Sequence, residues 1–178
     1  MQSSLFFSLA LISTFVLAAY DHKTGRMPNW LTLSSWACAL GLHGLAGGVE
    51  GLLLAFLSGF FVAAAPLGLF LLTKGEAIGG GDVKALLGIG AWIGPLAGLH
   101  ALLLSLLLLA AFAYWREARR RQLWPLLKRS LQLFSPSGHR APLQASFATV
   151  RFGPFLAVGT TVTVLANWLQ GVLTLGGL

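Results

Sequence analysis

The sequence predicts an all-α integral membrane protein with about six transmembrane helices, folded as a single membrane-embedded domain over residues 1–178. Hydrophobic residues make up 56% of the chain, and only 10% of the residues are charged. A soluble globular domain carries about 25% charged residues and could not hide this much apolar surface. The apolar residues come in runs, and the basic residues lie between the runs, as they do in the loops of membrane proteins.

The apolar runs place the expected spans. Since a bilayer core needs about 20 residues of helix, we expect spans at about residues 1–19, 29–46, 51–72, 83–93, 96–115 and 152–173. The division between the fourth and fifth spans is set at Gly94–Pro95, because a proline inside a helix removes a hydrogen bond and clashes with the preceding turn.

Charge supports this division. With it, all 12 Lys and Arg residues fall on one side of the membrane, and the other side carries Glu50. The positive-inside rule then predicts that both termini lie outside the cytoplasm and that residues 116–150 form a basic cytoplasmic loop. This loop is expected to meet anionic lipid headgroups through a short amphipathic helix, or else to be structureless.

The expected fourth span, residues 83–93, is unusually short. At 1.5 Å per residue it reaches only about 17 Å, well short of the bilayer core of about 30 Å. Irregular backbone at membrane depth is tolerated only inside protein or beside water. The short span is therefore the first indication of a functional site.

Two acidic residues lie at matched positions. The chain has five acids, and two of them, Asp21 and Asp82, fall at the inner ends of the first and fourth expected spans. Carboxylates at membrane depth are costly and are candidates for function. The alternative is that each one only caps or charges a helix end.

Two neighbouring carboxyl groups can hydrolyse an amide. Like charges at close range do not both ionise easily, so one proton is shared between them. The ionised carboxylate accepts a proton from water, and the protonated carboxyl donates a hydrogen bond to the substrate carbonyl. No metal and no covalent intermediate is needed.

The residues around Asp82 fit close approach by a substrate. Gly79, Gly80 and Gly81 precede it, and their bare backbone permits unusual dihedral angles, against which an extended substrate strand could lie. The alternative is an ordinary flexible turn. Lys84 either holds a carboxylate in its ionised form or is a charge that only sets topology.

Three segments resemble a known family. The run from Gly79 to Lys84, GGGDVK, resembles the GxGD motif of membrane aspartic proteases. The segment DHKTGRMPN, which begins at Asp21, is similar to the segment of the type IV prepilin peptidases in which an aspartate precedes Pro-Asn. The segment Arg151–Ala157 resembles their Pro-Phe-Gly-Pro-Phe signature, with Arg151 where the family usually has proline. With the three motifs in the family's order on a six-span chain, the resemblance extends over nearly the whole sequence.

The resemblance implies a bacterial inner-membrane aspartic endopeptidase, part of a type IV pilus or protein secretion system. Such enzymes remove the short basic leader of prepilins and pseudopilins at the cytoplasmic face. Asp21 and Asp82 then become the catalytic pair, Gly79 and Gly81 the motif glycines, and Lys84 keeps its usual place after the aspartate. Glu76 either binds the basic leader or is a plain loop charge.

The resemblance also limits the partners. Many members carry an N-terminal methyltransferase domain with paired CxxC motifs, whereas this chain begins with the first span and has Cys38 as its one cysteine. We therefore expect no methyltransferase activity, no cofactor and no metal. The expected partners are prepilin-type substrates and membrane lipid, without nucleic acid, and the sequence does not indicate an oligomeric state.

Two other functions use the same features. A small proton- or cation-coupled transporter could employ Asp21 and Asp82 as ligands, although we find no internal repeat of the kind such transporters show. A scaffold of a pilus or secretion machine could use residues 116–150 as a docking surface. A scaffold has no need for either aspartate.

Overall fold

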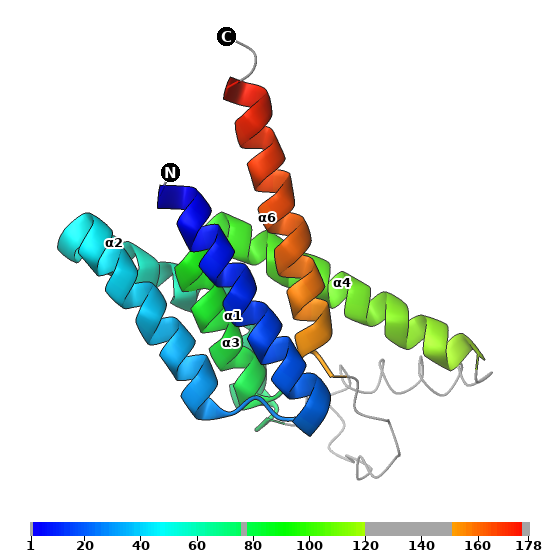
Figure 1. Cartoon of the computed structure of the whole chain (residues 1–178). Helices are drawn as coiled ribbons and strands as arrows, with labels where there is room; N and C mark the ends of the chain where they lie inside the picture. Colours follow the sequence, from blue (N-terminus) through cyan, green and yellow to red (C-terminus); the bar gives the residue numbers. More distant parts are fainter. Residues whose placement is uncertain (1, 76–77, 120–150, 176–178) are drawn as a thin grey trace.

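The computed structural model describes residues 2–75, 78–119 and 151–175, which contain helices and turns and no strand. Figure 1 shows the helices α1 (Gln2–Thr24), α2 (Asn29–Leu72), α3 (Gly80–Ile93), α4 (Pro95–Arg119) and α6 (Gly153–Leu175). Within the described residues, three helices, α1, α2 and α4, are long and apolar enough to cross a membrane by length and composition. Glu76 and most of the expected basic loop, residues 120–150, lie outside the described residues.

Helix α2 consists of two antiparallel arms. The backbone leaves helical geometry at Gly48, where φ is 62° and ψ is −150°, a conformation that glycine adopts readily. On either side of this reversal the arms pack together, because the Trp36 ring lies 5.7 Å from that of Phe56 and 6.2 Å from that of Phe60. The reversal falls between the second and third expected spans.

The break expected at Gly94–Pro95 is present. Helix α3 ends at Ile93, Gly94 adopts a positive φ of 85°, and α4 begins at Pro95. Proline suits this first helical position because the N–H that it lacks would have had no acceptor within the helix. The chain therefore turns sharply between two helices.

Two helix ends differ from the expected bounds. Helix α1 continues to Thr24, beyond residue 19, so Asp21 lies within the last turns of a helix and not in a loop. Helix α3 begins at Gly80 and not at residue 83, so Asp82 lies in its first turn. In both cases a polar stretch without an apolar pattern is nevertheless helical, because backbone hydrogen bonding continues past the apolar run.

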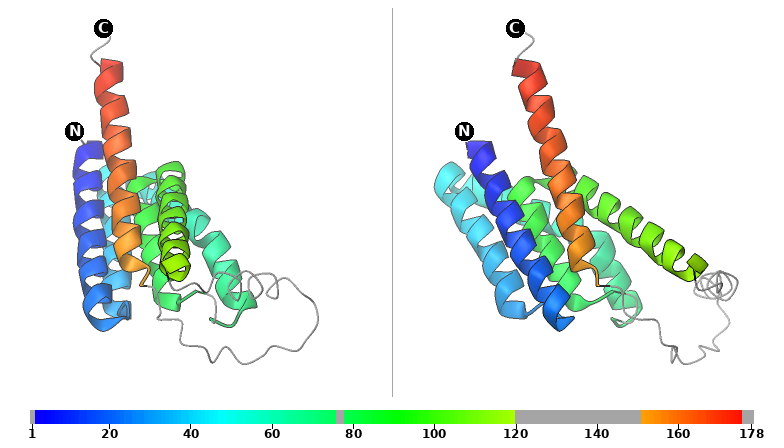
Figure 2. Two further views of the ribbon diagram at one scale, coloured as in Figure 1. Left: turned by 90° about the vertical axis from the view of Figure 1, so that its right-hand side faces the viewer. Right: turned by 45° about the vertical axis from the view of Figure 1, so that its right-hand side comes forward.

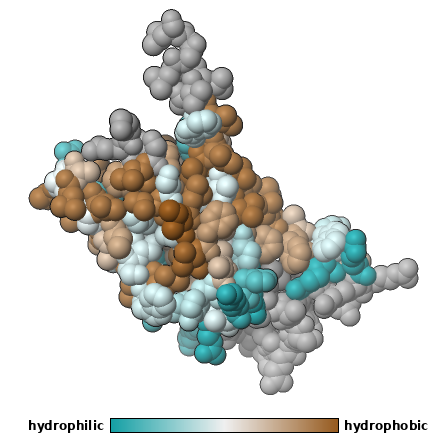
Figure 3. Space-filling view, in the orientation of Figure 1, coloured by the Kyte–Doolittle hydropathy of each residue, from teal (hydrophilic) through white to brown (hydrophobic). Residues whose placement is uncertain are grey.

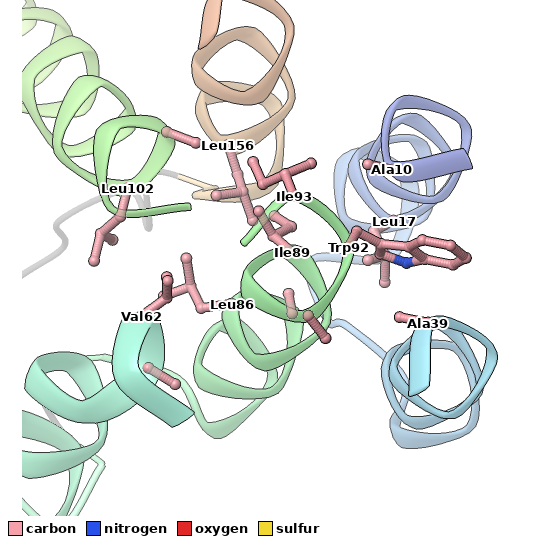
Figure 4. Close-up of a cluster of buried hydrophobic side chains, with 14 of the residues drawn as sticks. Ala10, Leu17, Ala39, Val62, Leu86, Ile89, Trp92, Ile93, Leu102 and Leu156 are labelled. Carbon is pink, nitrogen blue, oxygen red and sulfur yellow. The ribbon is translucent and has the colours of Figure 1, made fainter. Parts of the chain in front are cut away.

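The short helix α3 is the centre of the bundle (Figure 4). It buries Leu86, Ile89 and Trp92 almost completely, as expected for a helix that is apolar on every side. Side chains from the surrounding helices close around it: Ala10 and Leu17 from α1, Ala39 and Val62 from the two arms of α2, Leu102 from α4, and Leu156 from α6. With 14 residues, α3 is about 21 Å long, so it is short in the structure as well.

Glycines allow α3 to approach α2 closely. A Cβ atom on Gly59 of α2 would lie 2.6 Å from the carbonyl oxygen of Leu87, and one on Gly90 of α3 would lie 2.7 Å from that of Ser58. Both separations are shorter than real Cβ atoms show, so a side chain at either position would force the two backbones to shift. The second arm of α2 and α3 are thereby held at backbone contact.

On the face drawn in Figure 3 the bundle is mostly apolar, and its hydrophilic residues gather mainly toward one end. Figures 1 and 2 show which helix ends lie there. Large apolar side chains such as Leu107, Leu72 and Phe61 are exposed, which suits lipid as the surrounding medium. The α1–α2 connection, the start of α3, the end of α4 and the start of α6 lie toward the same end, and both termini lie toward the other. The described basic residues belong to the first of these ends: Lys23, Arg26, Lys74, Lys84, Arg116, Arg119 and Arg151.

The close contact between α2 and α3 predicts the effect of a single methyl group. Gly59→Ala should lower the thermal unfolding temperature of the purified protein, with a cost of roughly 1–3 kcal/mol, because the methyl overlaps the backbone of α3. Gly41→Ala is the matched control in the same helix, since nothing lies within 4 Å of its Cβ position, and it should be neutral or slightly stabilising. Equal effects of the two changes would contradict the contact.

Candidate functional site

Three helix ends meet at the charged end of the bundle. Asp21 lies near the C-terminal end of α1, Asp82 lies in the first turn of α3, and Gly153 is the first residue of α6. The N-terminal ends of α3 and α6 thus each place a backbone N–H beside a carboxyl group. Helix N-termini favour negative charge because their backbone N–H groups lack partners within the helix.

The Asp21 side chain is buried and oriented. It is only 5% exposed, and its Oδ2 atom accepts a hydrogen bond from the Gly153 backbone N–H at 3.0 Å. The Asp21 carbonyl oxygen accepts a second bond, at 2.8 Å, from the N–H of Gly25. Gly25 has a φ of 68°, the left-handed conformation that commonly ends a helix. The backbone and side chain of Asp21 are therefore both fixed.

The environment of Asp82 opposes ionisation of its carboxyl group. Asp82 lies before the fourth expected span and outside the three long apolar helices. Burial, and after it the nearby negative charge of Asp21, raise its pKa to about 6, while a backbone hydrogen bond from Gly79 acts in the opposite direction. The last contact resembles a capping arrangement, in which a side chain in the first helical turn reaches back to the N-cap. The two carboxyls are thus close enough to influence one another.

The motif glycines serve close packing and not unusual dihedral angles. Gly79 has a φ of −73°, and neither Gly80 nor Gly81 is among the residues with positive φ, so none of the three glycines adopts a left-handed conformation in this structure. A Cβ on Gly79 would lie 3.2 Å from Oδ2 of Asp82, and one on Gly81 would lie 2.9 Å from Cβ of Met27. Gly79 therefore leaves room for the carboxyl, and Gly81 lets the α1–α2 connection lie against α3.

Lys84 has a partner that the sequence did not indicate. Its ammonium group donates a hydrogen bond to the side-chain oxygen of Asn29 at 2.7 Å. Since Asn29 begins α2, this bond joins the starts of α2 and α3 beside the carboxyls. Glu76, the remaining expected site residue, lies outside the described residues.

Within the described ranges no three His, Cys, Asp or Glu side chains gather as metal ligands would. What the site offers is two carboxyls of unequal environment and the backbone N–H groups around them. Such a pair can transfer protons in both directions.

Sequence reasoning missed the partner of Asp21. The segment Arg151–Ala157 was noted as a motif, but no role was assigned to Gly153. The signal was available in part, because a glycine before proline at the start of an apolar run marks a helix start. Nothing in the sequence indicates which carboxyl this helix start meets.

Comparison with known proteins gives one family. The model of the type IV leader peptidase family matches residues 8–114. Among curated proteins, the prepilin leader peptidase/N-methyltransferases of Burkholderia pseudomallei strains 1026b and K96243 are each 30% identical over 154 residues, covering 83% of this chain and 42% of the relative. The chain thus spans less than half the length of these relatives. No solved structure matches it.

The environment of Asp82 predicts a pH-dependent stability. In the unfolded chain the carboxyl ionises near its ordinary pKa of 3.8, and in the folded chain near 6. Stability that is complete below pH 4 is therefore lost as the pH rises through about 6, by roughly 3 kcal/mol in total. Asp82→Asn removes this loss. Its thermal unfolding temperature relative to wild type should rise by several degrees between pH 4 and pH 7.5.

Glu50 is an acid at the opposite end of the bundle, so Glu50→Gln is the control. Its unfolding temperature relative to wild type should not rise in this way between pH 4 and pH 7.5. A difference between Asp82→Asn and wild type that stays constant with pH would contradict the raised pKa.

Proposed function

Since the chain belongs to the type IV leader peptidase family, we propose that it is a membrane aspartic endopeptidase whose catalytic pair is Asp21 and Asp82. Its proposed substrates are prepilin-type proteins, from which it removes a short basic leader. The observation that carries the proposal is that two carboxyls from separate helices influence one another at one end of an apolar bundle. The names of the curated relatives support the substrate class.

The proposed mechanism gives the two carboxyls different roles. Asp82 is the member that takes the proton, because burial and the charge of Asp21 raise its pKa from 3.8 to about 6 and so favour its protonated form. Asp21 is the ionised member in this proposal, since its Oδ2 accepts a backbone N–H and an ionised carboxylate acts only as an acceptor. The proton that the pair shares belongs to both groups together.

Hydrolysis then follows from this division. Asp21 accepts a proton from a water molecule, and the oxygen of that water attacks the carbonyl carbon of the substrate peptide bond. Asp82 donates its proton to the carbonyl oxygen, which gives a neutral tetrahedral intermediate. When the C–N bond breaks, the proton held by Asp21 passes to the leaving amine, the hydroxyl proton returns to Asp82, and the pair regains its starting state.

The charge distribution supports a cytoplasmic site. The described basic residues lie toward the end of the bundle that carries Asp21 and Asp82, and the positive-inside rule places that end in the cytoplasm. We propose six spans, at about residues 1–19, 29–46, 51–72, 83–93, 96–115 and 152–173, with both termini outside the cytoplasm. The membrane is then the bacterial inner membrane.

The role of the two carboxyls predicts the outcome of isosteric substitution. Asp21→Asn and Asp82→Asn should each abolish cleavage of a co-expressed prepilin, read as a gel shift, because each removes one half of the proton transfer. Glu50→Gln should cleave normally. All three variants should be inserted in the membrane at wild-type levels.

Persistent cleavage by either aspartate variant would remove that residue from the mechanism. Wild type without cleavage of any leader type would overturn the proposed function, and ion flux would then be measured, because a transporter could use the same two acids.

The proposed topology predicts the side on which each connection lies. A reporter inserted between residues 119 and 151 should read cytoplasmic, and one inserted at Gly48 should read periplasmic. If both insertions read on the same side, the two arms of α2 or the later helices do not cross the membrane as proposed.

A further inference from the structure

The first turn of α6 is pressed against the end of α1 that carries Asp21. Gly153 is buried, and a Cβ atom built on it would lie 2.8 Å from Oδ2 of Asp21, 2.9 Å from its Cβ and 3.2 Å from Cα of Ala18. The first two separations are shorter than real Cβ atoms show. Glycine is therefore required here for space, because it lets the backbone of α6 reach a carboxyl on another helix.

The bond between these helices gives the Gly153 N–H an acceptor that its own helix does not supply. The N–H of the first residue of a helix has no acceptor within its own helix. In this structure the Gly153 N–H is satisfied by the Asp21 carboxyl at 3.0 Å, so a side chain from α1 acts as the cap of α6. The bond to the backbone also removes the freedom of the Asp21 carboxyl to rotate.

The position of α6 is set independently of Asp21. Gly159 of α6 lies against Ser105 and the carbonyl oxygen of Ala101 in α4. The Phe155 ring lies 5.4 Å from that of Phe112, also in α4. Because α4 holds the body of α6, the N–H of its first residue is presented at a fixed place and does not simply follow the carboxyl.

The exposed side chain of Arg151 contacts the same junction between α1 and α6. Its guanidinium lies 3.7 Å from the Cβ position of Gly25, the residue whose N–H bonds to the Asp21 carbonyl oxygen. Residues 151–153 thus contact both the side-chain partner of Asp21 and the turn that ends α1. The arginine in the place of the family proline is compatible with this arrangement.

We propose that the backbone amide of Gly153 is a positioning group for the peptidase reaction, holding the Asp21 carboxyl by Oδ2 so that its other oxygen is presented to the attacking water. This inference rests on the proposed function. It adds to that function a requirement for α6, which lies beyond residues 8–114, the part of the chain that the family model matches. Gly153 touches no reacting atom and acts through Asp21.

Gly153→Ala tests this role against Gly51→Ala. Both changes add one methyl to a crowded glycine, but Gly51 lies against the carbonyl oxygen of His43 near the reversal of α2, so only the first displaces Asp21. On folded, purified protein with a prepilin substrate, Gly153→Ala should lower kcat by about tenfold or more, since small misplacements of a catalytic group cost that much. KM should stay within about twofold, because the substrate contacts are retained.

The control should behave differently. Gly51→Ala should lower the unfolding temperature while kcat per folded molecule stays near wild type, because its contact with His43 involves neither Asp21 nor α6. An unchanged kcat for Gly153→Ala, or an equal loss of kcat in both variants, would overturn the positioning role. Wild type without any cleavage is a separate result, because it overturns the proposed function itself.

A second measurement applies if Gly153→Ala does not fold. The unfolding temperatures of Asp21→Ala, Gly153→Ala and the double variant form a cycle that isolates the coupling between the two positions. The added methyl should cost clearly less when Asp21 is alanine, because the overlap with Oδ2 is gone. If Gly153→Ala folds only when Asp21 is also changed to alanine, that result supports the contact as well. Strictly additive effects on the unfolding temperature would contradict the contact.

Discussion

A carboxyl group buried at the end of an apolar helix needs polar partners, and the arrangement of this chain follows from how Asp21 obtains them. At 5% exposure the Asp21 side chain is largely removed from solvent, and an unpaired charge there would be costly. The N-terminal end of α6 supplies an N–H to its side chain, and Gly25 supplies one to its carbonyl oxygen. Asp82 brings a second carboxyl to the same place. Charge repulsion between the two is therefore built into the fold.

The short central helix explains how Asp82 comes to lie there. Because α3 is surrounded by the other helices, it does not need the length that contact with lipid on both sides of the bilayer would require. Its first turn lies among the ends of α1 and α2, where Gly81 admits Met27 and Lys84 bonds to Asn29. Burial and charge then act on Asp82 together and raise its pKa to about 6. The short length of α3 and the raised pKa of Asp82 thus both follow from the central place of α3 in the bundle.

Much of this arrangement was predictable from the sequence. Apolar runs and the distribution of basic residues predicted a helical membrane protein, and the proline after Gly94 predicted a break that the structure contains. The aspartates were chosen because acids are rare in such a chain and these two fall at matched helix ends. These predictions needed only the composition of the chain and the spacing of residues along it.

Contacts between distant segments were beyond that reasoning. The N–H of Gly153 meets Asp21 across 132 positions of the chain, and no periodicity relates the two. The packing role of the glycines before Asp82 could not be predicted for the same reason: it is set by Met27 and the Asp82 carboxyl, which only the folded chain places beside them. Helix α1 also continues beyond the expected span, because polar residues 20–24 extend it through backbone bonds that have no apolar signature.

The central claim is that Asp21 and Asp82 form an electrically coupled pair that retains a proton. Infrared difference spectroscopy of the protonated carboxyl C=O stretch, from pH 4 to 8, tests it most directly. In wild type the account predicts a band that disappears near pH 6 and is absent from Asp82→Asn. In Asp21→Asn the same band should disappear at lower pH, because the neighbouring charge is gone. A band that disappears near pH 4 in wild type, or at one pH with and without Asp21, would contradict the coupled pair.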